Sequence, residues 1–248
     1  MKLRPRDGEH SAAEFSRDPN ARDVDCPLTR RDFVRVLGAG LLISVVADPL
    51  PAQRRGRSGP DGEAHVLARI HVGQDGMITV LSGKIEMGQG ARGELSQAAA
   101  EELRVPWDRV QMVLGDTSLV PDDGVTAGSR TTPSTVPAVR RGAAAARQLL
   151  VALACRRWNV TPETVEVRDG QIVHPPTQQS LTYATLATEE NLSELFNQPV
   201  SDDVELTPVN QWRVLGSPHP RPGLRDYVTG NHKYPSDAPP VIVKFFKE

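Results

Sequence analysis

Residues 77–106, MITVLSGKIEMGQGARGELSQAAAEELRVP, contain the elements around which the rest of the chain is expected to assemble. The apolar run at 77–81 predicts a strand. The segment from Gly83 to Gly93 is rich in glycine, which adopts backbone conformations that other residues avoid, so a loop is expected. Residues 94–104 predict a helix that ends at Val105-Pro106. Its apolar face is formed by Leu95, Ala98, Ala99 and Leu103.

Further elements are expected on both sides of this stretch. Apolar residues alternate over 64–72, and a turn at 74–76 joins this strand to the next one as a hairpin. Downstream, the pattern predicts strands at 110–114, 165–168 and 172–173, a long helix at 139–158 and a short helix at 182–188. Strands and helices in this order indicate an α+β fold with helices packed on a mixed sheet, over residues 64–190.

Composition limits the classes of protein and of partner. The chain has 248 residues, enough for one or two domains, and its 21 prolines and 20 glycines argue against a helical bundle. A formal net charge of −2 gives no electrostatic reason to expect nucleic acid or anionic lipid as a partner. No internal disulfide is expected, because Cys26 lies in the N-terminal targeting region and leaves Cys155 alone.

The N-terminal residues 1–52 resemble a twin-arginine export signal. Arg30-Arg31 is followed by Phe33 and by a short apolar run at 37–46. That run is about half the length of a membrane-spanning helix, so a stable membrane span is not expected. The pattern predicts a periplasmic protein, and residues 53–63 are interpreted as a linker. The alternative is an unstructured tail followed by a buried helix.

The glycine-rich loop has the properties of a ligand site. Gly88 and Gly90 permit close approach of a ligand, and Gln89 between them offers an amide donor and acceptor. The N-terminus of the following helix offers free N–H groups to an anion such as a cofactor phosphate. On these residues alone, a purely structural loop is the favoured interpretation and a ligand site is the alternative.

A second polar segment begins at Gly115-Asp116-Thr117 and continues over 124–132 with Thr126, Gly128 and Ser129. Its hydroxyl and N–H groups are suited to binding phosphate. On these residues alone, the favoured interpretation is a loop in which Ser134 or Thr135 caps the long helix. Neither segment contains a cluster of residues with the spacing of metal ligands, so no metal ligand is assigned.

Taken together, the two segments resemble the molybdenum-binding subunit of the xanthine dehydrogenase/aldehyde oxidase family, most closely the exported isoquinoline 1-oxidoreductase and nicotinate dehydrogenase branch. The resemblance rests on residues 83–90, 99–106, 115–117 and 124–129 and continues to the segment 223–237. It implies that Gln89, between Gly88 and Gly90, hydrogen-bonds an oxo group on molybdenum. It also implies that Thr126, Gly128 and Ser129 lie near the pterin dinucleotide, expected in its cytosine form.

The same resemblance implies what is missing from this chain. The family's general base is a glutamate in a later segment that this sequence does not contain, so no catalytic residue is assigned; Glu101 and Glu102 are expected to be solvated. Residues 191–248 are interpreted as an irregular lead-in to a further domain, with a divergent tail after Asp237.

Three hypotheses follow. In the first, the chain is one piece of a split molybdenum hydroxylase that acts on aldehydes or N-heterocycles, with the rest of the molybdenum subunit on a second polypeptide and an iron–sulfur electron-transfer subunit. It would be inactive alone and would hold molybdopterin only once completed. In the second, it is a truncated, non-catalytic binding protein, and in the third it is a periplasmic interaction protein without a cofactor.

Overall fold

The computed structural model describes residues 40–47, 65–117, 119–120, 122–188, 204–234 and 237. The predicted Arg30-Arg31 pair, the linker at 53–63 and the tail after Asp237 lie outside these residues.

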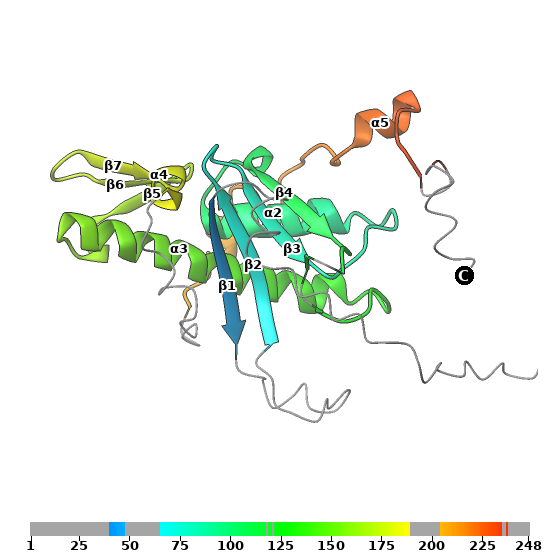
Figure 1. Ribbon diagram of the computed structural model, residues 1–248, viewed down its shortest axis with the longest axis horizontal. Coiled ribbons are helices and arrows are strands. Elements are labelled where there is room, and N and C mark those ends of the chain that lie inside the picture. The colour runs from blue at the N-terminus through cyan, green and yellow to red at the C-terminus, as the bar shows by residue number, and fades with distance from the viewer. Residues whose placement is uncertain are drawn as a thin grey trace, which may run out of the picture.

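A mixed four-stranded sheet forms the centre of the fold, as predicted (Figure 1). Its strands follow one another in sequence order, with antiparallel pairing between the first three and parallel pairing between the last two. The strands are β1 (Gly40–Ala47), β2 (His65–Gly73), β3 (Ile78–Ser82) and β4 (Val110–Leu114). The parallel pair requires a crossover connection, which the helix between β3 and β4 provides.

Two helices pack against this sheet. Helix α2 (Ala91–Leu103) connects β3 to β4, and α3 (Val136–Trp158) crosses the sheet beside it (Figure 1). Both begin earlier in the sequence than predicted. Arg104 follows the last residue of α2 as its C-cap, and its left-handed backbone (φ 54°) lets its N–H bond to the helix carbonyls. The shared core includes fully buried aliphatic side chains: Ile70, Val72, Val80, Leu95, Leu103 and Leu150.

The apolar run of the predicted export signal contributes β1. Residues Gly40–Ala47 pair with β2 along one edge of the sheet, and the side chains of Leu41 and Ile43 are only 2% and 3% exposed. The alternative of a buried helix at this position is therefore wrong. A role of the run in export stays a prediction. No helix within the described residues is long and apolar enough to cross a membrane.

A small second sheet lies beside the end of α3. It comprises β5 (Glu166–Arg168), β6 (Gln171–His174) and β7 (Gln179–Thr182), followed by α4 (Tyr183–Ala187). The sequence pattern predicted the first two strands and the helix but not β7. The buried hydroxyl of Tyr183 donates to the carbonyl oxygen of Leu103 at 2.9 Å, which ties this sheet to the end of α2.

Residues 204–234 are mostly irregular, as predicted, with a short 3-10 turn at Val209–Gln211 and the helix α5 (Leu224–Thr229). Residues 204–223, called here the C-terminal strap, run beside α2. Beyond the strap, α5 projects away from the sheet (orange in Figure 1). The side chains of Leu224 and Val228 on α5 are exposed.

Candidate functional site

The two polar segments lie at one edge of the main sheet. Because β3 and β4 are parallel, both strands end there, and the glycine-rich loop follows β3 just as the second segment follows β4. The N–H of Gly115 donates to the carbonyl oxygen of Ser82 at 3.1 Å and fixes where the two loops begin. Loops at the carboxyl ends of parallel strands are a common position for ligand sites.

Lys84 joins the two loops. Its side chain is 3% exposed, and the ammonium group donates to three consecutive carbonyl oxygens of the second loop, those of Asp123 (2.8 Å), Gly124 (3.1 Å) and Val125 (3.1 Å). The N–H of Ile85 also donates to Oγ1 of Thr126 at 2.9 Å. The first loop is therefore bonded directly to Thr126, one of the residues predicted for the site. Lys84 itself was not singled out from the sequence.

Asp123 lies at the base of this junction. Its Oδ2 accepts a hydrogen bond from the hydroxyl of Ser82 at 2.6 Å, while its Oδ1 is buried and has no hydrogen-bond partner among the described residues. Burial raises the pKa of Asp123, and the Ser82 hydrogen bond and the charge of Lys84 only partly oppose this shift. The junction thus contains a carboxyl group with one unused acceptor.

Glu86 organises the glycine-rich loop from within. Its Oε1 accepts from the N–H groups of Gly88 (2.8 Å) and Gly90 (3.0 Å), and its Oε2 accepts from the N–H of Arg92 (2.9 Å). The guanidinium of Arg221 in the C-terminal strap approaches Oε1 at 3.3 Å. Burial alone would raise the pKa of Glu86, but the three backbone donors and Arg221 outweigh it and lower that pKa.

This arrangement corrects one expectation. The N-terminus of α2 was predicted to offer free N–H groups to a cofactor anion, yet the carboxylate of Glu86 already accepts from Gly90 and Arg92 there. The same contacts explain why α2 begins before the predicted residue 94, since this carboxylate satisfies donors that would otherwise be orphaned.

Gln89 is exposed at the tip of the loop. Its Oε1 accepts from the N–H of Met87 at 2.6 Å, and its Nε2 donates to the carbonyl oxygen of Ile85 at 2.8 Å. An amide has a second N–H and a second lone pair, so each end keeps capacity for one more partner. Gly88 (φ 99°) and Gly90 (φ 89°) have open space where a side chain would begin. The loop therefore leaves room for a cofactor to approach Gln89.

The remaining predicted residues, Gly128 and Ser129, lie on the same loop as Thr126 but make no hydrogen bond to the glycine-rich loop within the described part of the chain. Both have left-handed backbones, with φ of 61° and 55°. The prediction that Ser134 or Thr135 caps the long helix is wrong. Residues Thr131–Thr135 form a wide helical turn that leads into α3, and the Thr135 side chain makes no capping hydrogen bond.

The prediction that Glu101 and Glu102 are solvated is also wrong. Glu101 is 4% exposed, and its Oε2 accepts from three consecutive backbone N–H groups of the strap, at Arg213, Val214 and Leu215, over 2.7–3.0 Å. Glu102 is completely buried and accepts from the N–H (3.0 Å) and hydroxyl (2.9 Å) of Thr207. These two carboxylates hold the strap along α2.

Two arginines of α3 compensate the buried charge of Glu102. Arg140 forms an ion pair with its Oε1 at 2.6 Å, and Arg147 lies 3.8 Å from its Oε2. Arg140 also donates to the carbonyl oxygen of Thr207 at 2.7 Å, so the strap, α2 and α3 share one polar network.

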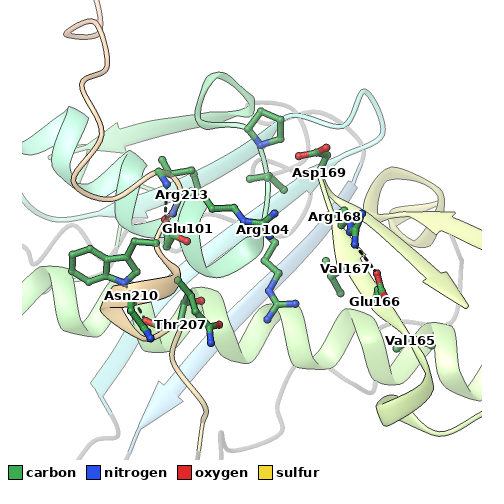
Figure 2. Close-up of a pocket in the computed structure, with 16 residues that line it drawn as sticks. Glu101, Arg104, Val165, Glu166, Val167, Arg168, Asp169, Thr207, Asn210 and Arg213 are labelled. Atoms are coloured by element: carbon green, nitrogen blue, oxygen red, sulfur yellow. Dashed lines mark hydrogen bonds and ion pairs between the residues drawn. The ribbon is translucent and has the colours of Figure 1, made fainter. Parts of the chain in front are cut away.

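A groove of about 770 Å³ lies between the strap, the end of α2 and strand β5 (Figure 2). Arg104 and Arg213 line it on the side of α2 and the strap, and an exposed Arg168–Glu166 pair (3.1 Å) lies on the β5 side. None of the residues predicted for the site lines this groove. In the described part of the chain, no group of three or more His, Cys, Asp or Glu side chains is arranged to hold a metal ion.

Comparison with known proteins identifies the relatives of this chain. It is 29% identical over 209 residues to a nicotinate dehydrogenase subunit of Pseudomonas putida, covering 84% of this chain and 17% of that protein. It is 28% identical over 251 residues to the beta subunit of isoquinoline 1-oxidoreductase of Brevundimonas diminuta, covering 85% of this chain and 32% of that protein. The chain therefore spans a third or less of the length of these relatives.

Among solved structures, quinoline 2-oxidoreductase from Pseudomonas putida 86 aligns with 53% of this chain at 21% identity and a TM-score of 0.43. The assignment to a family rests on sequence. Residues 30–230 match the family described as the molybdopterin cofactor-binding domain, and this range includes both loops of the site. The chain therefore belongs to the molybdopterin-binding xanthine dehydrogenase/aldehyde oxidase family.

Proposed function

We propose that this chain is the cofactor-contacting N-terminal portion of an exported molybdenum hydroxylase, and that it is inactive until a second polypeptide supplies the rest of the molybdenum subunit. The observation that carries the proposal is the junction at Lys84, which bonds the loop of Gln89 to the loop of Thr126. Two loops that the family uses around one cofactor are thereby fixed side by side.

In this proposal the cofactor approaches the exposed face of the glycine-rich loop. Gly88 and Gly90 leave the space, and Gln89 offers its unused amide donor and acceptor. Thr126, Gly128 and Ser129 face the pterin dinucleotide, proposed to be the cytosine form. When bound, the cofactor supplies oxidative hydroxylation with an oxygen atom derived from water.

The partners and substrates are proposed from the relatives. Nicotinate dehydrogenase and isoquinoline 1-oxidoreductase are, by their names, enzymes that act on N-heterocycles, and the matched chains are subunits of them. An N-heterocycle or an aldehyde is accordingly the proposed substrate class, and an iron–sulfur subunit the proposed electron acceptor.

The proposed function is tested by affinity purification of the tagged full chain from its native host. We expect a larger polypeptide to co-purify with molybdenum, measured by inductively coupled plasma mass spectrometry, and we expect no hydroxylase turnover from the chain alone. If neither a partner nor molybdenum accompanies the folded chain, the proposal is wrong and a cofactor-free binding protein is the better description.

Export is tested separately by cell fractionation. The wild-type chain is expected in the periplasm, and a variant with both Arg30 and Arg31 changed to Lys is expected to remain in the cytoplasm. A Lys2→Arg variant serves as the control, because it alters a basic residue outside the predicted signal pair. Equal periplasmic amounts of all three would contradict a twin-arginine route.

A further inference from the structure

The environment of Gln89 is determined by a residue three positions before it. Gln89 lies between two glycines, and both glycine N–H groups donate to the same oxygen of Glu86, at 2.8 and 3.0 Å. The other oxygen of Glu86 accepts from the N–H of Arg92 in the first turn of α2. The Glu86 carboxylate therefore fixes the conformation of the loop tip.

We propose that Glu86 is a positioning residue for Gln89: its carboxylate acts as a built-in anion at the start of α2 and sets the loop conformation in which Gln89 meets the cofactor. The inference rests on the proposed function, since Gln89 needs positioning only if it contacts a cofactor.

A carboxylate is the group this position requires. It offers two acceptor oxygens and no donor, which matches three N–H groups and one guanidinium. A glutamine at position 86 would keep one acceptor oxygen and would direct an NH₂ group at backbone donors that it cannot bond. Glu86→Gln therefore removes at least one backbone contact as well as the charge.

The charged groups around Glu86 come from two elements. Arg92 and Glu94 lie in the first turn of α2, and Arg221 approaches from the strap at 3.3 Å. The ammonium of Lys84, on the same loop, is directed to carbonyl oxygens of the second loop. Arg221 is the only cation that forms an ion pair with Glu86 among the described residues. Glu101 and Glu102 hold earlier residues of the same strap. The strap thereby provides the cation that pairs with Glu86 in the loop that presents Gln89.

The position of Glu86 also limits where a cofactor phosphate can bind. Because Glu86 occupies the N-terminus of α2, a phosphate there would place a second anion against the same N–H groups. The proposed phosphate contacts therefore fall to the second loop, around Thr126 and Ser129, rather than to the helix.

The test compares Glu86→Gln with Glu94→Gln in the full chain. Glu94 is in the first turn of α2 and carries the same charge. Its backbone N–H donates to the carbonyl oxygen of Gly90 at 3.1 Å, but its side chain, which the substitution changes, makes no hydrogen bond to the glycine-rich loop among the described residues. We expect Glu86→Gln to speed amide hydrogen exchange at Gly88, Gly90 and Arg92 about tenfold or more, and to shift the NMR signals of the Gln89 side-chain amide. Glu94→Gln and the amides of β3 are expected to match wild type.

Lowering the pH provides a second readout. The pKa of Glu86 is lowered in the folded chain, so protection of Gly88 and Gly90 should persist at neutral pH and fade as the pH drops through that pKa. Exchange is compared after correction for its intrinsic pH dependence. The fading should be absent in Glu86→Gln.

Molybdenum content of the co-purified complex separates the positioning role from the proposed function. If Glu86→Gln leaves the loop amides and the Gln89 signals unchanged, the positioning role is wrong whatever the metal content. If the variant loosens the loop but the complex keeps its molybdenum and its kcat, Glu86 is merely structural and the inference is also overturned. If the wild-type complex contains no molybdenum, the proposed function fails, although the loop measurements still report on Glu86.

Discussion

Removal of the buried carboxylate at Glu102 should release the C-terminal strap. The side chain of Glu102 is completely buried, while those of its partners Arg140 and Arg147 are 17% and 10% exposed. Glu102→Ala leaves both guanidinium groups without their carboxylate and removes the acceptor for the N–H and hydroxyl of Thr207. Breaking a buried ion pair by deleting one partner costs about 3–5 kcal/mol in free energy of unfolding.

The loss is expected toward the lower end of that range. Arg140 keeps its hydrogen bond to the carbonyl oxygen of Thr207, and Arg147 keeps one to the carbonyl oxygen of residue 102. With a urea dependence of about 2 kcal/mol per molar, the unfolding midpoint should fall by roughly 1.5 M or more. Urea unfolding followed by circular dichroism measures this shift.

Two further variants make the measurement decisive. Glu166→Ala removes an acid whose ion pair with Arg168 is largely exposed (56% and 71%), so its cost should stay below about 1 kcal/mol. Thr207→Val removes only the hydroxyl donor to Glu102 and should lower the free energy of unfolding by about 1 kcal/mol. This milder variant keeps the prediction testable if Glu102→Ala does not fold. If Glu102→Ala and Glu166→Ala shift the midpoint equally, the carboxylate does not hold the strap.

Three other changes have defined outcomes. Lys84→Met removes the ammonium that binds three carbonyl oxygens, so amide exchange over residues 122–126 should rise about tenfold while that of β2 stays constant; unchanged exchange would refute the junction. Leu95→Ala, at a completely buried position, should lower the free energy of unfolding by about 2–5 kcal/mol in thermal melts, and a cost near zero would contradict its place in the core. Burial raises the pKa of Tyr183 above its usual 10.0, so the unfolded chain loses this proton first, and stability should fall as the pH rises above about 10. Tyr183→Phe should weaken that alkaline loss, and an identical pH profile would show that Tyr183 is not its source.

The sequence predicts best what is encoded locally. Strand, glycine-rich loop and helix over residues 77–106 were expected from apolar spacing and glycine, and they occur as β3, the loop and α2. That both loops serve one cofactor was inferred from family resemblance. Their direct contact was not predicted, because no local sequence pattern indicates that β3 and β4 are parallel neighbours. Lys84 was missed for the same reason, since its carbonyl partners lie about 40 positions away.

The errors concern residues whose partners are distant in sequence. Glu101 and Glu102 were predicted to be solvated because charged residues on a helix usually are. Their donors come from the proline-rich strap, which has no periodicity that would predict where it packs. The apolar run at 37–46 shows a related limit. Its composition is typical of an export signal, yet residues Gly40–Ala47 also form a strand that pairs with β2 at the edge of the sheet.

The carboxylate contacts of α2 also bear on how the chain reaches its native state. Thr207 bonds Glu102 across 105 positions, and Leu215 bonds Glu101 across 114. Such separations raise the relative contact order, and closure of loops this long slows folding. During synthesis from the N-terminus, α2 and α3 emerge well before residue 215, so Glu101 and Glu102 can bond the strap only after both helices are present. We therefore expect docking of the strap to be a late event in folding, which buries the Glu101 and Glu102 side of α2.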